Sequence, residues 1–182
     1  MDALGDAIVV WPGDNAGRFR IVARRYVPGQ GWGTTQPIDG DDADDAYDPS
    51  IAMDACGRAV VAWRQEVRMK NRIVANRFVP GDGWGTARRI IRFWAEGGSP
   101  DVAMDPAGNA IVVWQQANFE TFDIWANRFV PGQGWGWAEL VEANGVAKTH
   151  TPRVGMDPAG NAVAVWTADY IGSTSIQGKV LQ

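Results

Sequence analysis

Three short segments each place a tryptophan between two glycines, and these tryptophans could bind a sugar. The segments are YVPGQGWG, ending at Gly33, FVPGDGWG, ending at Gly85, and FVPGQGWG, ending at Gly136. Sugar rings stack on indole faces, and a polar side chain stands two positions before each tryptophan. Packing against a neighbouring repeat is the simpler role, and it is the one that we expect first for these tryptophans. The candidate ligand-binding residues are Trp32, Trp84, Trp135, Gln30, Asp82 and Gln133.

Other reactive side chains are sparse. His150 is the one histidine, which excludes multi-histidine zinc sites and makes any Ser-His-Asp triad depend on a single loop residue. Cys56 is the one cysteine, so no intrachain disulfide can form, and we expect it to be a small turn residue rather than a nucleophile. The sequence therefore predicts no catalytic residue, no metal site and no cofactor.

Six aspartates crowd the run DGDDADDAYD, residues 39–48, and the whole net charge of −4 comes from it. Its spacing fits no EF-hand, so we expect a solvated loop that crosses between repeats. The sign of the charge alternates along the chain, from acidic to basic to acidic. A nucleic-acid surface needs one continuous basic face, so nucleic acid is not expected as a partner.

A fourfold repeat underlies all of these residues. The segments MDALGDAIVVW, MDACGRAVVAW, MDPAGNAIVVW and MDPAGNAVAVW begin at Met1, Met53, Met104 and Met156, at spacings of 52, 51 and 52 residues. In the turn MDPAGN, Asp105 can accept hydrogen bonds from the backbone amides that follow, and Gly108 can take a positive φ. The repeated aspartate is therefore expected to build a turn rather than to hold calcium.

Each repeat reads as four short strands. In the third they are PDVAMD, NAIVVWQQ, IWANRFV and GWGWAELVE, and the second strand is apolar on both faces, as in a sheet covered on both sides. The segments between the second and third strands, residues 12–20, 64–72, 115–123 and 167–175, read as irregular loops. Helices are not expected, because β-branched residues and Gly or Pro clusters recur throughout.

Four antiparallel strands repeated with short connections predict an all-β fold, a β-propeller of blades of about 52 residues. The chain holds about 3.5 repeats and forms one domain, 1–182, divided into a partial blade 1–52, blades 53–103 and 104–155, and a partial blade 156–182. The ring is incomplete in one chain. Either the chain is a piece of a ring of roughly 6 to 8 blades, or it completes itself as a homo-oligomer; an open arc is the third reading.

The segments P-x-V-A-M-D-P-A-G-N-A-x-V-V-W and R-F-V-P-G-Q-G-W-G resemble the blade repeat of bacterial propellers distantly similar to the sialidase or Asp-box group. That resemblance implies a site with three arginines, a tyrosine nucleophile beside a glutamate, and an aspartic acid. Arg25, Arg77 and Arg128 lie on the predicted third strands, where an ion pair or an amphipathic edge explains them. Of the three tyrosines, Tyr26 occupies the repeated aromatic position of the third strand, Tyr47 lies in the acidic run, and Tyr170 lies in the last loop without an adjacent glutamate.

We therefore expect a non-catalytic binding or scaffold module whose ligand is a glycan or a protein. The resemblance implies an extracytoplasmic or secreted location, although MDALGDAIVVW lacks the features of a signal peptide. No apolar stretch approaches the roughly 20 residues that span a bilayer, so membrane insertion is not expected. One alternative is a fragment of a sialidase-like glycoside hydrolase or lyase, using Glu66, Glu120 and Asp123. The other is a purely structural repeat.

Overall fold

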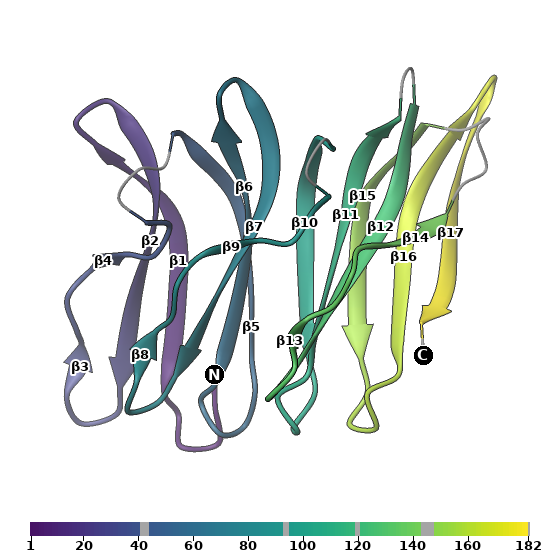
Figure 1. The fold of residues 1–182 in the computed structure, drawn as a ribbon. Helices are drawn as coiled ribbons and strands as arrows, with labels where there is room; N and C mark the ends of the chain where they lie inside the picture. Colours follow the sequence, from purple (N-terminus) through teal and green to yellow (C-terminus); the bar gives the residue numbers. More distant parts are fainter. Residues whose placement is uncertain (41–43, 93–94, 119–120, 143–147, 182) are drawn as a thin grey trace.

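A computed structural model describes residues 1–40, 44–92, 95–118, 121–142 and 148–181. These residues form four antiparallel sheets that stand side by side (Figure 1). Sheet I contains β1 (Ala7–Asn15), β2 (Arg18–Val27), β3 (Gly31–Trp32) and β4 (Gln36–Pro37). Sheet II contains β5 (Ala46–Met53), β6 (Ala59–Val67), β7 (Lys70–Val79), β8 (Gly83–Trp84) and β9 (Arg88–Arg89).

The second half of the chain repeats this pattern. Sheet III contains β10 (Gly97–Met104), β11 (Ala110–Asn118), β12 (Thr121–Val130), β13 (Gly134–Trp135) and β14 (Glu139–Glu142), and sheet IV contains β15 (Lys148–Met156), β16 (Ala162–Tyr170) and β17 (Ser173–Leu181). The predicted all-β, antiparallel architecture is confirmed. The described residues form no helix, and hence none that could cross a membrane.

The core lies between the sheets, in three apolar clusters that each join two neighbours. Side chains alternate along β6, so that Val61 and Trp63 pack against sheet I while Val60 and Ala62 pack against sheet III. All four are fully buried. The predicted burial of both faces of this strand is therefore confirmed, and each sheet has one face for the preceding sheet and one for the following sheet.

The MDPAGN turns form as the sequence predicts. The Asp105 carboxylate accepts the backbone N–H of Asn109 at 3.0 Å, and Gly108 has a φ of 88°. In the preceding repeat, Asp54 accepts the N–H groups of Cys56 and Arg58 at 2.9 and 3.0 Å. These turns and the β7–β8 type of turn lie at the same end of the sheets (Figure 1), as expected from up-and-down strand order.

The segments that read as irregular loops are instead strand pairs, so that prediction was wrong. Strands β6 and β7 stay in register from Ala59 opposite Phe78 to Val67 opposite Lys70, and Arg68 and Met69 close the ribbon. Strands β1 and β2 pair in the same way as far as Asn15 opposite Arg18. The charged side chains of these segments resemble a loop in sequence, but ladder hydrogen bonds use only the backbone, and both faces of a projecting ribbon tolerate charge.

The outer strand of sheet III, like those of sheets I and II, differs from the predicted continuous strand GWGWAELVE. It is divided into β13 and β14, which pair separately with β12. Between them the N–H of Gly136 still donates to the carbonyl of Arg128 at 2.9 Å. Residues 137 and 138 then leave the ladder, which places Trp137 at the surface with 90% of its area exposed.

The acidic run is not a solvated loop at its described positions, so that expectation was wrong there. Asp39 is buried, pairs with Arg20 at 2.8 Å and accepts the N–H of Ile21 at 3.0 Å. Asp45 accepts the N–H of Phe19 at 2.8 Å, which ties the crossover to sheet I. Residues 41–43 of the run lie outside the described residues. The carboxylates serve as hydrogen-bond acceptors for backbone that would otherwise lack a partner.

Candidate functional site

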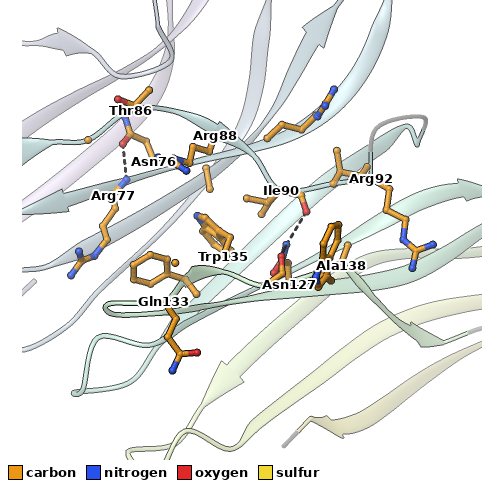
Figure 2. A pocket seen from close by; sticks show the side chains of 18 residues that line it. Asn76, Arg77, Thr86, Arg88, Ile90, Arg92, Asn127, Gln133, Trp135 and Ala138 are labelled. Atoms are coloured by element: carbon orange, nitrogen blue, oxygen red, sulfur yellow. Dashed lines mark hydrogen bonds between the residues drawn. The ribbon is translucent and has the colours of Figure 1, made fainter.

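A cleft of about 980 Å³ opens between sheets II and III, beside their short outer strands. Sheet II contributes β7, β9 and the crossover that follows β9, and sheet III contributes β12 and the segment from β13 to Ala138. Figure 2 shows Trp135 lying between the ribbon that carries Arg88 and the ribbon that carries Asn127. The cleft therefore forms only where two consecutive repeats meet.

Buried asparagines hold the two walls together. The Asn127 side chain donates from Nδ2 to the carbonyl of Ile90 at 3.0 Å, across the gap between the sheets (Figure 2), and to the carbonyl of Gly136 at 3.2 Å. Asn76 makes the equivalent bond to the carbonyl of Ile38 one sheet earlier, at 2.8 Å. The segment ANRF thus fixes each crossover to the next sheet, because a buried amide satisfies a backbone carbonyl that has left its ladder.

One wall of the cleft is aromatic. Trp135 packs edge-on against Phe129, with ring centroids 5.6 Å apart, and is half-buried against sheet II. Trp137 also lines the cleft and is almost fully exposed. An indole with a free face offers a flat apolar surface beside an N–H donor, which suits a ligand with one apolar face and polar edges.

The opposite wall is cationic. The Arg77 guanidinium lies 5.0 Å from the centroid of the Phe129 ring, and that of Arg92 lies 4.9 Å from the Trp125 ring, so both reach from sheet II to sheet III. Arg88 and Arg89 add two exposed cations on β9. No aspartate or glutamate is among the described residues that line this cleft. Cations in a concave surface raise the local concentration of anions, so the cleft favours a negatively charged ligand.

Two of the six predicted ligand-binding residues line this cleft, namely Trp135 and Gln133. Trp84 instead packs on Phe78 at 5.4 Å and borders the core between sheets I and II. Trp32 packs on Tyr26 at the same distance and stays 46% exposed.

Gln30 and Asp82 are exposed in the corresponding turns. The ligand-binding role of all six residues stays a prediction.

Sequence reasoning missed the cleft residues that do not recur. The position of Arg88 is held by Gln36 in the first repeat and by Glu139 in the third. The run ARRIIRFW therefore departs from the repeat where TQPIDG and AELVEA stand in its place, and Trp137 has no tryptophan counterpart. A departure from an otherwise regular repeat was the signal that could have identified this wall.

The carboxylates considered for hydrolytic chemistry lie elsewhere. Asp123 is buried on β12 and accepts a hydrogen bond from Asn118 at 2.9 Å, and its burial raises the pKa of the carboxyl above its usual range. Glu66 is half-buried on β6, and Glu120 lies outside the described residues. Over the described ranges, no three potential metal ligands lie close enough together to hold an ion.

His150 makes a separate polar contact on sheet IV. Its Nε2 lies 2.8 Å from the Asp169 carboxylate, and the Thr151 hydroxyl lies 3.4 Å from its Nδ1. Hydrogen bonds from His150 and then Thr174 lower the pKa of Asp169. This group is separate from the residues that line the cleft.

Solved structures share this fold. An ulvan lyase from a new family of polysaccharide lyases aligns with a TM-score of 0.69 and 11% identity, over 100% of this chain and 54% of its own. The ulvan lyase bound to -[GlcA(1-4)Rha3S]- gives 0.68 and 12% over the same shares. An endo-arabinase from Bacteroides thetaiotaomicron gives 0.57 and 14%, over 99% of this chain and 72% of its own.

These likenesses concern the fold, because sequence identity is low throughout. No protein-family model matches the sequence, and no curated protein matches it by sequence. The chain spans about half the length of the ulvan lyase chain. The predicted architecture-level resemblance to β-propellers is confirmed.

Proposed function

We propose that this chain is a non-catalytic carbohydrate-binding module that takes an acidic glycan in the cleft between sheets II and III. The observation that carries the proposal is the composition of the cleft, where two tryptophans face four arginines and no carboxylate among the described lining residues. A sugar ring would stack on Trp137 or Trp135, and its carboxylate or sulfate groups would meet Arg88 and Arg92. Arginine suits this role because its planar fork of donors matches such anions.

The fold neighbours support a carbohydrate ligand. The solved structures described above include an ulvan lyase and an endo-arabinase, and one is bound to a fragment that contains a uronic acid and a sulfated sugar. An acidic polysaccharide ligand would fit the expected extracytoplasmic or secreted location. A protein ligand is the second reading, since a cavity of about 980 Å³ is in the size range of small-ligand pockets rather than of a broad flat interface.

The experiment is calorimetric titration with a size-defined sulfated oligosaccharide that contains uronic acid, with a neutral arabinan oligosaccharide as the comparison. We expect binding of the acidic ligand alone, weakened as salt is raised because the ions screen the arginines. Trp137→Ala should weaken it about tenfold, as expected for loss of one stacking contact. Arg88→Gln should weaken it and reduce its salt dependence.

The matched control is Arg18→Gln, which removes an exposed arginine at the β1–β2 ribbon, away from the cleft. This variant should bind as the unmodified chain does. No binding at millimolar oligosaccharide, or equal loss in the control, would contradict the proposal and favour a structural repeat.

A fragment of a glycoside hydrolase or lyase is the second candidate. It is favoured by the activities in the names of the fold neighbours, a lyase and an endo-arabinase. Release of new chain ends from either oligosaccharide, lost on Asp123→Asn or Glu66→Gln, would support it. Binding without any release of chain ends supports the module.

A further inference from the structure

The two end sheets expose apolar side chains that the inner sheets bury at the same repeat position. Ile73 and Ile124 are fully buried, whereas Ile176, the equivalent residue of sheet IV, is 72% exposed. On sheet I the same contrast holds for Val9, which is 41% exposed while its counterpart Val61 is fully buried. In each case the end sheet has the same apolar residue as the inner sheet, but no neighbouring sheet covers it.

The uncovered surface of sheet IV is its following face. In the inner sheets this face carries Val60 and Ala62 of sheet II, which pack against sheet III. Its members on sheet IV are exposed by 40 to 72% and lie together on β16 and β17, since Val163 pairs with Val180 and Thr167 with Ile176. We call the following surface the sheet IV face: Val163, Val165, Ile176 and Val180. Contiguous apolar exposure of this kind marks an interaction site.

The uncovered surface of sheet I is its preceding face. In sheet II the equivalent residues Val61, Trp63 and Trp84 pack against sheet I. The corresponding set in sheet I is the sheet I face: Val9, Trp11, Tyr26 and Trp32. Every internal interface joins the following face of one sheet to the preceding face of the next, so the two uncovered faces are the two halves of that same interface.

We propose that the sheet IV face of one copy docks on the sheet I face of a second copy, and that two copies close head to tail into a ring. The occupant follows from the three internal interfaces, which show that a sheet of this repeat covers each of these faces. A contact between two different faces closes only when the rotation completes a circle. Since one chain spans 54% of the ulvan lyase chain, two copies match the length of one such chain.

The proposed interface between two copies lacks the arginine–aromatic contact that the internal interfaces contain, and restoring that contact tests the proposal. Inside the chain, Arg25 lies over Phe78 and Arg77 over Phe129, at 5.4 and 5.0 Å from the ring centroids. At this repeat position sheet IV has Val180, and the aromatic counterpart on sheet I is Tyr26. Val180→Arg would place a guanidinium over Tyr26 of the second copy and should tighten the dimer by about two- to fivefold.

Light scattering of the 182-residue chain tests the assembly by measuring its mass in solution, which is 19.8 kDa for a single chain. We expect twice that mass at micromolar concentration. Val9→Asp and Ile176→Asp should each shift the chain to monomer, because each buries a charge on one of the two faces. The control is Ile171→Asp, which changes a fully exposed isoleucine between β16 and β17 that belongs to neither face.

Circular dichroism and thermal melts establish that the variants fold, which the exposure of both sites favours. An unmodified chain that stays monomeric at about 100 µM overturns the proposal. So does a dimer that only one of the two face variants disrupts, since that pattern indicates contact between like faces. The glycan-binding cleft lies within one copy, so its failure or success is measured independently of this assembly.

Discussion

At the scale of single residues, arginines on the third strand connect neighbouring sheets. The Arg25 guanidinium lies over Phe78 of the next sheet, and Arg77 lies over Phe129. A cation over an aromatic face stabilises by about 0.5 to 2 kcal/mol, more where water is excluded. The arginine of the repeated R-F or R-Y pair therefore joins sheet I to sheet II and sheet II to sheet III, by packing on the aromatic ring of the following repeat.

The sequence had suggested an ion pair or an amphipathic edge for these arginines. An ion pair is present at Arg25, which contacts Asp6, but it does not recur with Arg77 or Arg128 among the described ion pairs. Arg128 instead donates to the carbonyl of Leu181 at 2.8 Å, on the last sheet. What recurs is the direction of the side chain toward the next sheet, which no single repeat considered alone can reveal.

Asp123 gives a prediction about pH at this scale. Burial raises the pKa of its carboxyl, so the folded chain holds the proton to higher pH than the unfolded chain, in which the pKa is near 3.8. Folding stability therefore falls as pH rises from 3.8 through the raised pKa. Asp123→Asn should raise Tm at pH 7 by up to about 3 °C and leave it unchanged near pH 3.

Thermal melts from pH 3 to 7 measure this difference. The Asn118 side chain can still donate to the new amide oxygen, so the hydrogen bond is kept. Asp82→Asn, in an exposed turn, is the matched control and should show no such pH dependence. A lower Tm for Asp123→Asn at pH 7 would mean that the stronger hydrogen bond to a charged carboxylate outweighs the cost of burying its charge.

At the scale of elements, the β6–β7 ribbon has an unusual tip. Arg68 and Met69 have φ values of 52° and 61°, a conformation that costs residues with a side chain roughly 1 to 2 kcal/mol each. In the β1–β2 ribbon the corresponding pair is Ala16 and Gly17, and the glycine relieves half of this cost. The ribbon of sheet II thus forms in spite of its turn residues.

Replacing that tip with the favoured turn dipeptide should stabilise the chain. The double change Arg68→Asn and Met69→Gly should raise the free energy of unfolding by about 1 kcal/mol, because Asn-Gly suits a two-residue turn with positive φ at both positions. Urea titration measures the change. Met69→Leu keeps a β-carbon at the strained position and should give no gain. The backbone N–H of Arg68 donates to Asp44 at 3.1 Å, and the double variant keeps this bond. A loss of stability in the double variant would show that the replaced side chains contribute more than the strain costs.

Much of the architecture could be predicted from the repeat, because the local sequence of each repeat determines its turns and its buried strand. The Asp105 turn and the buried strand around Val112 follow from local rules of hydrogen bonding and alternation. The ribbons could not be predicted. Residues such as Arg68 and Met69 oppose a two-residue turn, and it is the pairing of the long flanking strands that imposes it.

The candidate site could be predicted only in part. Trp135 was identified because it recurs, but the cationic wall around Arg88 belongs to the preceding repeat and faces it across a sheet interface. A recurring residue shows what every sheet needs, which is mostly packing, as Trp84 illustrates. Arg88 and Trp137 differ from the residues at the same position of the other repeats, so packing that is common to all sheets does not explain them. The proposed function depends on these two residues.

At the scale of the whole molecule, the chain is a row of sheets in which each contacts only its neighbours. Stability in such a row is close to a sum over sheets and interfaces, so a sheet with two covered faces is held more strongly than one with a single covered face. Asp101 adds a polar tie along the row, accepting from the Ser50 hydroxyl and from the N–H of Val154, both at 2.9 Å. Sheets II and III therefore form the stable centre.

Native-state hydrogen exchange tests this gradient. We expect the slowest exchange in β6, β7, β11 and β12 and faster exchange in β1, β2, β16 and β17, because opening an end sheet breaks one interface rather than two. Mass spectrometry of peptic fragments locates the exchange. Equal protection of all four sheets in a dilute, monomeric chain would show that the row opens as one cooperative unit.

Measuring exchange at several chain concentrations separates protection by neighbouring sheets of the same chain from protection by a second copy. If copies dock end to end as proposed, raising the chain concentration covers Val9 and Ile176 and should slow exchange in sheets I and IV together, with little effect on sheets II and III. The Ile176→Asp variant should show the gradient without this dependence on concentration. If exchange in sheets I and IV is fast at every concentration, the row of four sheets is still supported but the proposed ring of two copies is contradicted.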